Sequence, residues 1–148
     1  MARTGARKGA ARPAAGRKPT ATGSCLCGAV RYEVRGPLRQ VVNCHCGQCR
    51  KFHGHYGAYS SAAAKDISIT GYRSLKWYRS SNAARRGFCK ECGSSLFWER
   101  LKSGAIGIAA GTLDAPTKLR SIRHIFVDHR GDYYKIADRL RKSPGSMG

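Results

Sequence analysis

The seven cysteines of this 148-residue chain lie in three short groups. Cys44, Cys46 and Cys49 occur in the stretch NCHCGQC. The other four occur in pairs, in CLCG at 25 to 28 and in CKECG at 89 to 93. An odd number of closely spaced cysteines is typical of metal binding rather than of a disulfide framework. Thiolates brought together on tight glycine turns are typical ligands of zinc.

The two outer pairs can complete one zinc site between them. A closed structural zinc site needs four ligands, and each pair supplies two thiolates. The pairs are more than sixty residues apart, so a shared metal would connect an early strand to a late hairpin and stabilise the fold directly. We therefore predict a structural zinc ion bound by Cys25, Cys27, Cys89 and Cys92.

The remaining thiols are one fewer than a closed site needs. Cys44, Cys46 and Cys49 can hold a metal and leave one coordination position for a ligand, as catalytic zinc sites do. The alternative is a second closed site in which His53 or His55, both in KFHGHYG, supplies the fourth ligand.

His45 lies between two of the expected ligands, so its side chain is expected to point away from the metal. A different grouping would join the 44 to 49 cysteines to the 89 to 92 pair in a zinc ribbon. That grouping leaves Cys25 or Cys27 without a role, so we favour the first assignment.

Short segments of alternating apolar and polar residues predict a mainly β fold. The stretch GAVRYEVR (28 to 35) has the period-two pattern of a half-buried strand. Only the segment after Cys49 and DYYKIADRL (132 to 140) favour helical turns. Further strands, separated by Gly, Pro, Ser or Asp as in all-β domains, are expected at LRQVVN, HYGAYS, ISIT, LKWYR, SLFWE, AIGIAA and IRHIFV.

The chain is strongly basic, with 28 Lys and Arg against 8 Asp and Glu and a net charge of +20. Residues 1 to 22 are rich in Ala, Gly, Pro, Arg and Lys and have too few large apolar side chains to fold. We predict a disordered basic tail over 1–22, one domain over 23–141 and a flexible end over 142–148. A basic chain attracts anionic partners, either a small acidic substrate or nucleic acid.

No apolar run is long enough to span a bilayer, and none has the pattern of a signal peptide. The protein is therefore expected to have no membrane partner. Thiols used as metal ligands indicate a reducing compartment, so we predict a cytoplasmic protein.

Five motifs occur in order between residues 23 and 140. They are G-x-C-x-C-G from Gly23, C-H-C-x-x-C-R from Cys44, G-Y-x-x-L-x-x-Y from Gly71, F-C-x-x-C-G-x-x-L from Phe88 and H-I-F-V from His124. Together they resemble the glutathione-dependent formaldehyde-activating enzyme (GFA) and centromere protein V family.

That resemblance implies a β-tent fold of short antiparallel strands stapled by zinc, with two Zn²⁺ ions per chain. It implies a structural zinc on the residues of the outer pairs and a catalytic zinc on Cys44, Cys46 and Cys49. The implied activity is that of a carbon-sulfur lyase, which forms or breaks an adduct between a small thiol such as glutathione and an aldehyde such as formaldehyde.

The charge is compatible with either of two functions. Glutathione carries two carboxylates, so a basic rim with Arg50 and Lys51 directly after the last ligand suits it. The alternative function is a basic zinc-binding module that associates with nucleic acid without catalysis. In that case the tail would supply weak, nonspecific and salt-sensitive contacts.

Overall fold

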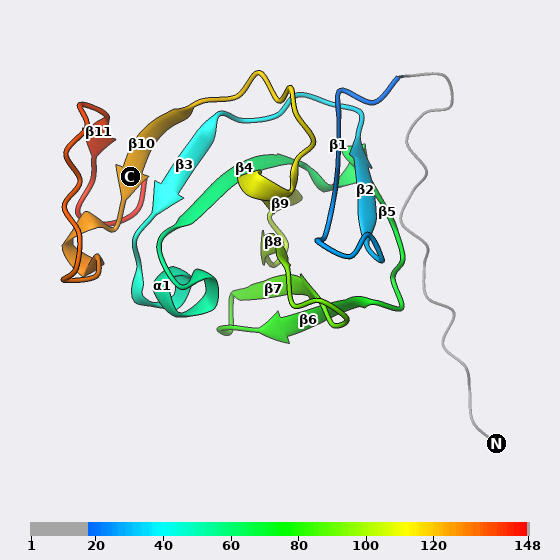
Figure 1. Cartoon of the computed structure of the whole chain (residues 1–148), viewed down its shortest axis with the longest axis horizontal. Helices are drawn as coiled ribbons and strands as arrows, with labels where there is room; N and C mark the ends of the chain where they lie inside the picture. The colour runs from blue at the N-terminus through cyan, green and yellow to red at the C-terminus, as the bar shows by residue number, and fades with distance from the viewer. Residues whose placement is uncertain (1–17, 148) are drawn as a thin grey trace.

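The computed structural model describes residues 18 to 147. Within them the chain forms short strands with little helix, which confirms the mainly β prediction (Figure 1). Most of the predicted tail, residues 1 to 17, lies outside the described residues. The first strand begins at Ala21, inside the segment that the sequence assigned to the tail.

A three-stranded antiparallel sheet lies at one end of the molecule (Figure 1). Its order is β1 (Ala21–Ser24), β2 (Arg31–Val34) and β5 (Ile67–Thr70). The amide of Thr20 donates to the Val34 carbonyl at 2.7 Å, so backbone pairing begins before β1.

The remaining strands form one long sheet. Strand β10 pairs in parallel with both of its neighbours, and the other pairs in this sheet are antiparallel. The parallel pair of β3 and β10 was not expected, because parallel neighbours need a long connection that local sequence patterns do not reveal. The order is β11 (Arg141–Lys142), β10 (Ser121–Ile125), β3 (Val41–Cys44), β4 (Gly57–Ala63), β9 (Ala105–Ala109), β8 (Ser95–Arg100), β7 (Ala84–Cys89) and β6 (Leu75–Arg79).

Helical structure is confined to short pieces. The helical turns expected after Cys49 are present in α1 (Gly47–His53), which begins before Cys49 and lies between the end of β3 and the start of β4. The helical turns expected for DYYKIADRL are wrong, because that segment follows an irregular path into β11. Among the described residues, no helix has both the length and the apolar character needed to cross a membrane. The 3-10 helices are η1 (Ala64–Asp66), η2 (Ala110–Thr112) and η3 (Val127–His129).

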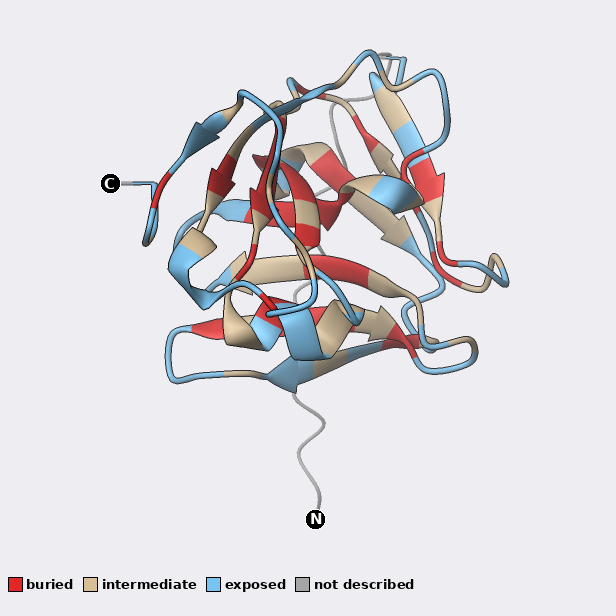
Figure 2. Ribbon diagram, turned by 60° about the vertical axis from the view of Figure 1, so that its left-hand side comes forward, coloured by how far each residue is buried: buried red, intermediate tan, exposed pale blue. Residues whose placement is uncertain are grey.

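The core lies where the three-stranded sheet packs against the long sheet, and Figure 2 shows the buried stretches along these strands. Tyr32 of β2 and Phe97 of β8 meet edge to face, with ring centroids 5.2 Å apart. The Tyr32 hydroxyl is hydrogen-bonded to Thr112 Oγ1 at 2.7 Å, so its polar end is satisfied. Burial of these rings fixes how the two sheets sit against each other.

Gly71, directly after β5, lies against the backbone that leads into β2 within the three-stranded sheet. Its φ is +83°, and a Cβ there would lie 1.8 Å from the carbonyl oxygen of Ala29. Gly104 has a similar φ of +74° but nothing within 4 Å of a Cβ, so it is the matched control. We expect Gly104→Ala to cost about 1 kcal/mol of unfolding free energy from its φ alone. Gly71→Ala should cost about 1–3 kcal/mol more, because the backbone must move.

Urea unfolding of the two metal-loaded variants would measure this difference. Equal destabilisation by both substitutions would show that the contact between Gly71 and Ala29 does not constrain the fold.

Candidate metal centres

The four outer cysteines converge on one point. Cys25 and Cys27 lie in the turn between β1 and β2, Cys89 ends β7, and Cys92 lies in the turn before β8. Their four sulfurs all lie within 4.8 Å of one another, with 3.6 Å from Cys25 to Cys27 and 3.8 Å from Cys27 to Cys89. Sulfurs about 2.3 Å from a tetrahedral zinc ion would be about 3.8 Å apart. The donor set therefore fits zinc in both chemistry and spacing.

Local backbone structure explains how each pair is held. Gly28 and Gly93 both have a φ of +78°, which turns the chain directly after each pair. The Val30 amide donates to Cys25 Sγ at 3.3 Å, a contact that favours a thiolate. A hydrogen bond with the Ser94 hydroxyl lowers the pKa of the Cys92 thiol to about 5. One cysteine in each turn, Cys25 and Cys92, thus has a lowered pKa.

The inner cysteines form a second, smaller cluster. Cys44 is the last residue of β3, Cys46 caps α1, and Cys49 lies in its first turn. Their sulfurs lie within 4.8 Å of one another, and in the described part of the chain no further His, Cys, Asp or Glu joins them. The Cys49 amide donates to Cys46 Sγ at 3.3 Å. Hydrogen bonds from Cys44 and Cys49 lower the pKa of Cys46.

The two histidines considered as a fourth ligand are hydrogen-bonded to tyrosine hydroxyls instead. His53 Nε2 is hydrogen-bonded to the Tyr59 hydroxyl at 2.7 Å, and His55 Nδ1 to the Tyr133 hydroxyl at 2.8 Å. Burial, with the nearby charge of Arg86, lowers the pKa of His53 to about 4, so its imidazole is neutral near pH 7. Neither side chain belongs to the three-cysteine cluster.

The zinc-ribbon grouping is not the one observed. Cys89 and Cys92 lie with Cys25 and Cys27, and the 44 to 49 cysteines form a cluster of their own. The structure therefore brings the seven sulfurs together in the groups of four and three that the sequence favoured.

His45 points away from the cysteines into a hydrogen-bonded network. It is 1% exposed, and it contacts the Tyr134 hydroxyl through Nδ1 and His124 through Nε2 at 2.8 Å. His124 in turn contacts Asp138 at 2.8 Å. Burial and the neighbouring His124 lower the pKa of His45 to about 4, so its ring stays neutral. This network ties the loop between β3 and α1 to the segment before β11.

A buried arginine lies on the other side of the three-cysteine cluster. Arg86 of β7 is 3% exposed, and its Nη2 lies 3.4 Å from Gln48 Oε1 and 3.7 Å from Cys49 Sγ. Its guanidinium carbon lies 5.2 Å from the centre of the Phe52 ring. The Nε and Nη1 atoms are buried without a hydrogen-bond partner. Arg86 was not among the residues predicted from the sequence, because no strand was expected at residues 84–89.

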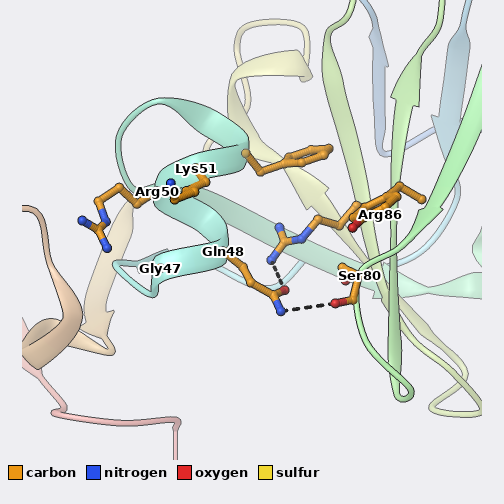
Figure 3. Close-up of a pocket in the computed structure, with 8 residues that line it drawn as sticks. Gly47, Gln48, Arg50, Lys51, Ser80 and Arg86 are labelled. Atoms are coloured by element: carbon orange, nitrogen blue, oxygen red, sulfur yellow. Dashed lines mark hydrogen bonds between the residues drawn. The ribbon is translucent and has the colours of Figure 1, made fainter.

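A cavity of about 430 Å³ lies beside Arg86, between α1 and strands β6 and β7 (Figure 3). Figure 3 shows Gln48 held between Arg86 and Ser80, whose carbonyl accepts from Gln48 Nε2 at 3.3 Å. Arg50 and Lys51, expected at a basic rim, are both exposed residues of its lining. The full lining is Gly47, Gln48, Arg50, Lys51, Phe52, Tyr78, Ser80 and Arg86.

Comparison with known proteins agrees with this arrangement. The sequence model of one family, described as glutathione-dependent formaldehyde-activating enzyme, matches residues 20 to 129. The match includes all seven cysteines and both clusters.

Individual relatives are more distant. A Halomonas elongata protein, whose provisional name is glutathione-dependent formaldehyde-activating enzyme, is 28% identical over 130 residues, covering 79% of this chain and 81% of its own. An uncharacterized lyase of Schizosaccharomyces pombe is 31% identical over 81 residues, covering 54% of this chain and 58% of its own. A crystal structure of a Rhodobacter sphaeroides protein shares the fold, with a TM-score of 0.55 and 26% identity over 64% of this chain and 88% of that one.

The His45 network predicts a difference between two neighbouring tyrosines. Tyr134→Phe leaves a nitrogen of the buried His45 without its partner, so it should cost about 1–3 kcal/mol of unfolding free energy. Tyr133→Phe removes an equivalent hydroxyl from the exposed His55 and should cost less than about 0.5 kcal/mol. Chemical denaturation of the metal-loaded variants measures both. Equal values would mean that the network does not hold the loop.

Proposed function

This chain belongs to the glutathione-dependent formaldehyde-activating enzyme family, and from that premise we propose that it is a zinc-dependent enzyme of the carbon-sulfur lyase type. Its substrates are a small anionic thiol of the glutathione kind and an aldehyde such as formaldehyde. One observation carries the proposal: the cluster that lacks a fourth ligand among the described residues is also the cluster beside the cationic cavity.

The two clusters take different roles in this proposal. Cys25, Cys27, Cys89 and Cys92 would hold a structural Zn²⁺ ion, since they supply the four ligands that such a site needs. Cys44, Cys46 and Cys49 would hold the catalytic Zn²⁺ ion. Zinc bound by three thiolates supplies a Lewis acid that favours the thiolate form of a substrate thiol.

The reaction needs no oxidant or reductant. A bond forms between the thiol sulfur and the aldehyde carbon, and the π pair of the carbonyl moves to its oxygen. The proton that leaves the thiol ends on that oxygen, which gives a hydroxymethyl thioether. The reverse reaction breaks the same carbon-sulfur bond and returns both reactants.

Charge around the three-cysteine cluster supports this chemistry. Three thiolates and one Zn²⁺ ion carry a net charge of roughly −1. Burying this negative charge is unfavourable unless a cation lies nearby. The Arg86 guanidinium lies 3.7 Å from Cys49 Sγ and supplies that cation. In the proposed enzyme, Arg86 stabilises the deprotonated ligands, while the exposed cations of the cavity attract an anionic thiol.

The nucleic-acid alternative receives no comparable support. The relatives carry names of enzymes, and the predicted basic tail lies mostly outside the described residues. We therefore keep the enzyme as the single proposal.

The two metal roles predict unequal effects of two substitutions. Cys92→Ser removes a ligand of the structural site and should cost about 3 kcal/mol or more of unfolding free energy. Cys46→Ser should leave a folded protein with about one zinc ion per chain instead of two, because Ser remains a preferred helix N-cap. Metal analysis and thermal unfolding test this. Equal loss of stability in both variants would contradict the separation of roles.

Catalysis itself is measured by exchange between free glutathione and its formaldehyde adduct, followed by nuclear magnetic resonance with ¹³C-labelled formaldehyde. The zinc-loaded protein should raise the exchange rate by at least about 100-fold over buffer, as proximity and thiol activation allow. Cys46→Ser should lose this acceleration while keeping the structural zinc. If the wild-type rate equals the buffer rate, this chain does not catalyse the reaction.

A further inference from the structure

The charged residues that line the cavity beside α1 are all cationic. Three of its eight lining residues are cationic and none is acidic. Arg50 and Lys51 are exposed, whereas Arg86 is buried in the inner wall. Figure 3 shows Arg50 extending away from Arg86, so these cations lie at different sides of the same hollow. A hollow of this kind concentrates anions.

Arg86 has more hydrogen-bonding capacity than the protein uses. None of the ion pairs within residues 18–147 includes Arg86, and its Nε and Nη1 atoms are without partners. A buried guanidinium without a carboxylate is unfavourable. Its charge is also poorly screened by salt, so its field extends into the cavity more strongly than that of an exposed lysine.

The wall next to Arg86 is already ordered. Gln48 accepts from Arg86 and donates to the Ser80 carbonyl, which fixes the orientation of its amide. Phe52 and Tyr78 add ring surface to the lining. The cavity therefore combines cationic, polar and apolar walls, as a site for an amino-acid-like ligand would.

Arg86 also connects the cavity to the metal ligands. Its Nη2 contacts both Gln48 in the cavity wall and Cys49 in the three-cysteine cluster. A thiol whose carboxylate lies in the cavity could therefore place its sulfur close to the cysteines. This contact is the structural reason for linking the two places.

Resting on the proposed function, we propose that this cavity binds a carboxylate of the substrate thiol and selects anionic thiols over neutral ones. Arg50 and Lys51 attract the carboxylate, and the buried charge of Arg86 holds it near the inner wall. Binding here is independent of the thiol group, so an analogue with a blocked sulfur still occupies the cavity.

The probe is S-methylglutathione, which keeps both carboxylates and lacks the thiol. Its dissociation constant is measured by calorimetry on the zinc-loaded full chain. Arg50→Gln/Lys51→Gln should weaken binding by about fivefold or more, as the loss of two partly exposed charge contacts implies. The control, Lys65→Gln/Lys102→Gln, removes the same charge from residues outside the cavity and should change binding by less than about twofold.

A second measurement separates this inference from the proposed function. With cobalt in place of zinc, 2-mercaptoethanol, which has no carboxylate, should change the absorption spectrum equally in wild type and Arg50→Gln/Lys51→Gln. Equal weakening of S-methylglutathione by both double variants would overturn the cavity assignment and leave the metal site unaffected. A cobalt spectrum that responds to no thiol would overturn the proposed function, whatever the cavity binds.

Discussion

The convergence of four sulfurs from two distant turns is the constraint on which the rest of this structure depends. Cys25 and Cys27 lie in a turn of the small sheet, and Cys89 and Cys92 lie at a turn of the long one, yet all four sulfurs lie within 4.8 Å of one another. The core between the sheets, centred on Tyr32 and Phe97, holds the same two layers together. A metal bound by these cysteines would therefore stabilise an arrangement that apolar packing already favours.

The three-cysteine loop, by contrast, is held by contacts with side chains on both sides of it. On one side, the His45 network fixes the loop to the segment before β11. On the other, Arg86 places a buried positive charge 3.7 Å from Cys49. The first contact positions the cysteines and the second balances their charge. Among the described residues these contacts leave a cluster of three sulfurs, and in the proposed enzyme the substrate thiol takes the fourth position on the metal.

Local sequence patterns predicted the parts of this architecture that depend on local physics. Thiol spacing and glycine turns predicted both cysteine clusters, and period-two alternation predicted most strands. The failures involve contacts between distant segments. The 132–140 segment was expected to be helical, but the contacts of Tyr134 with His45 and of Asp138 with His124 hold it in an irregular path. Arg86 was missed because the functional meaning of an arginine in a strand depends on its distant neighbours, here α1 and Cys49.

In the proposed enzyme, the protein supplies four sulfurs to one metal and three to the other. X-ray absorption at the zinc edge of the fully loaded protein tests it most directly, because it counts sulfur ligands averaged over both ions. We expect about 3.5 sulfurs per zinc in the free protein, the mean of four and three, rising to about 4 when glutathione is added. A free protein with 4 sulfurs per zinc, or a count that glutathione leaves unchanged, would contradict it.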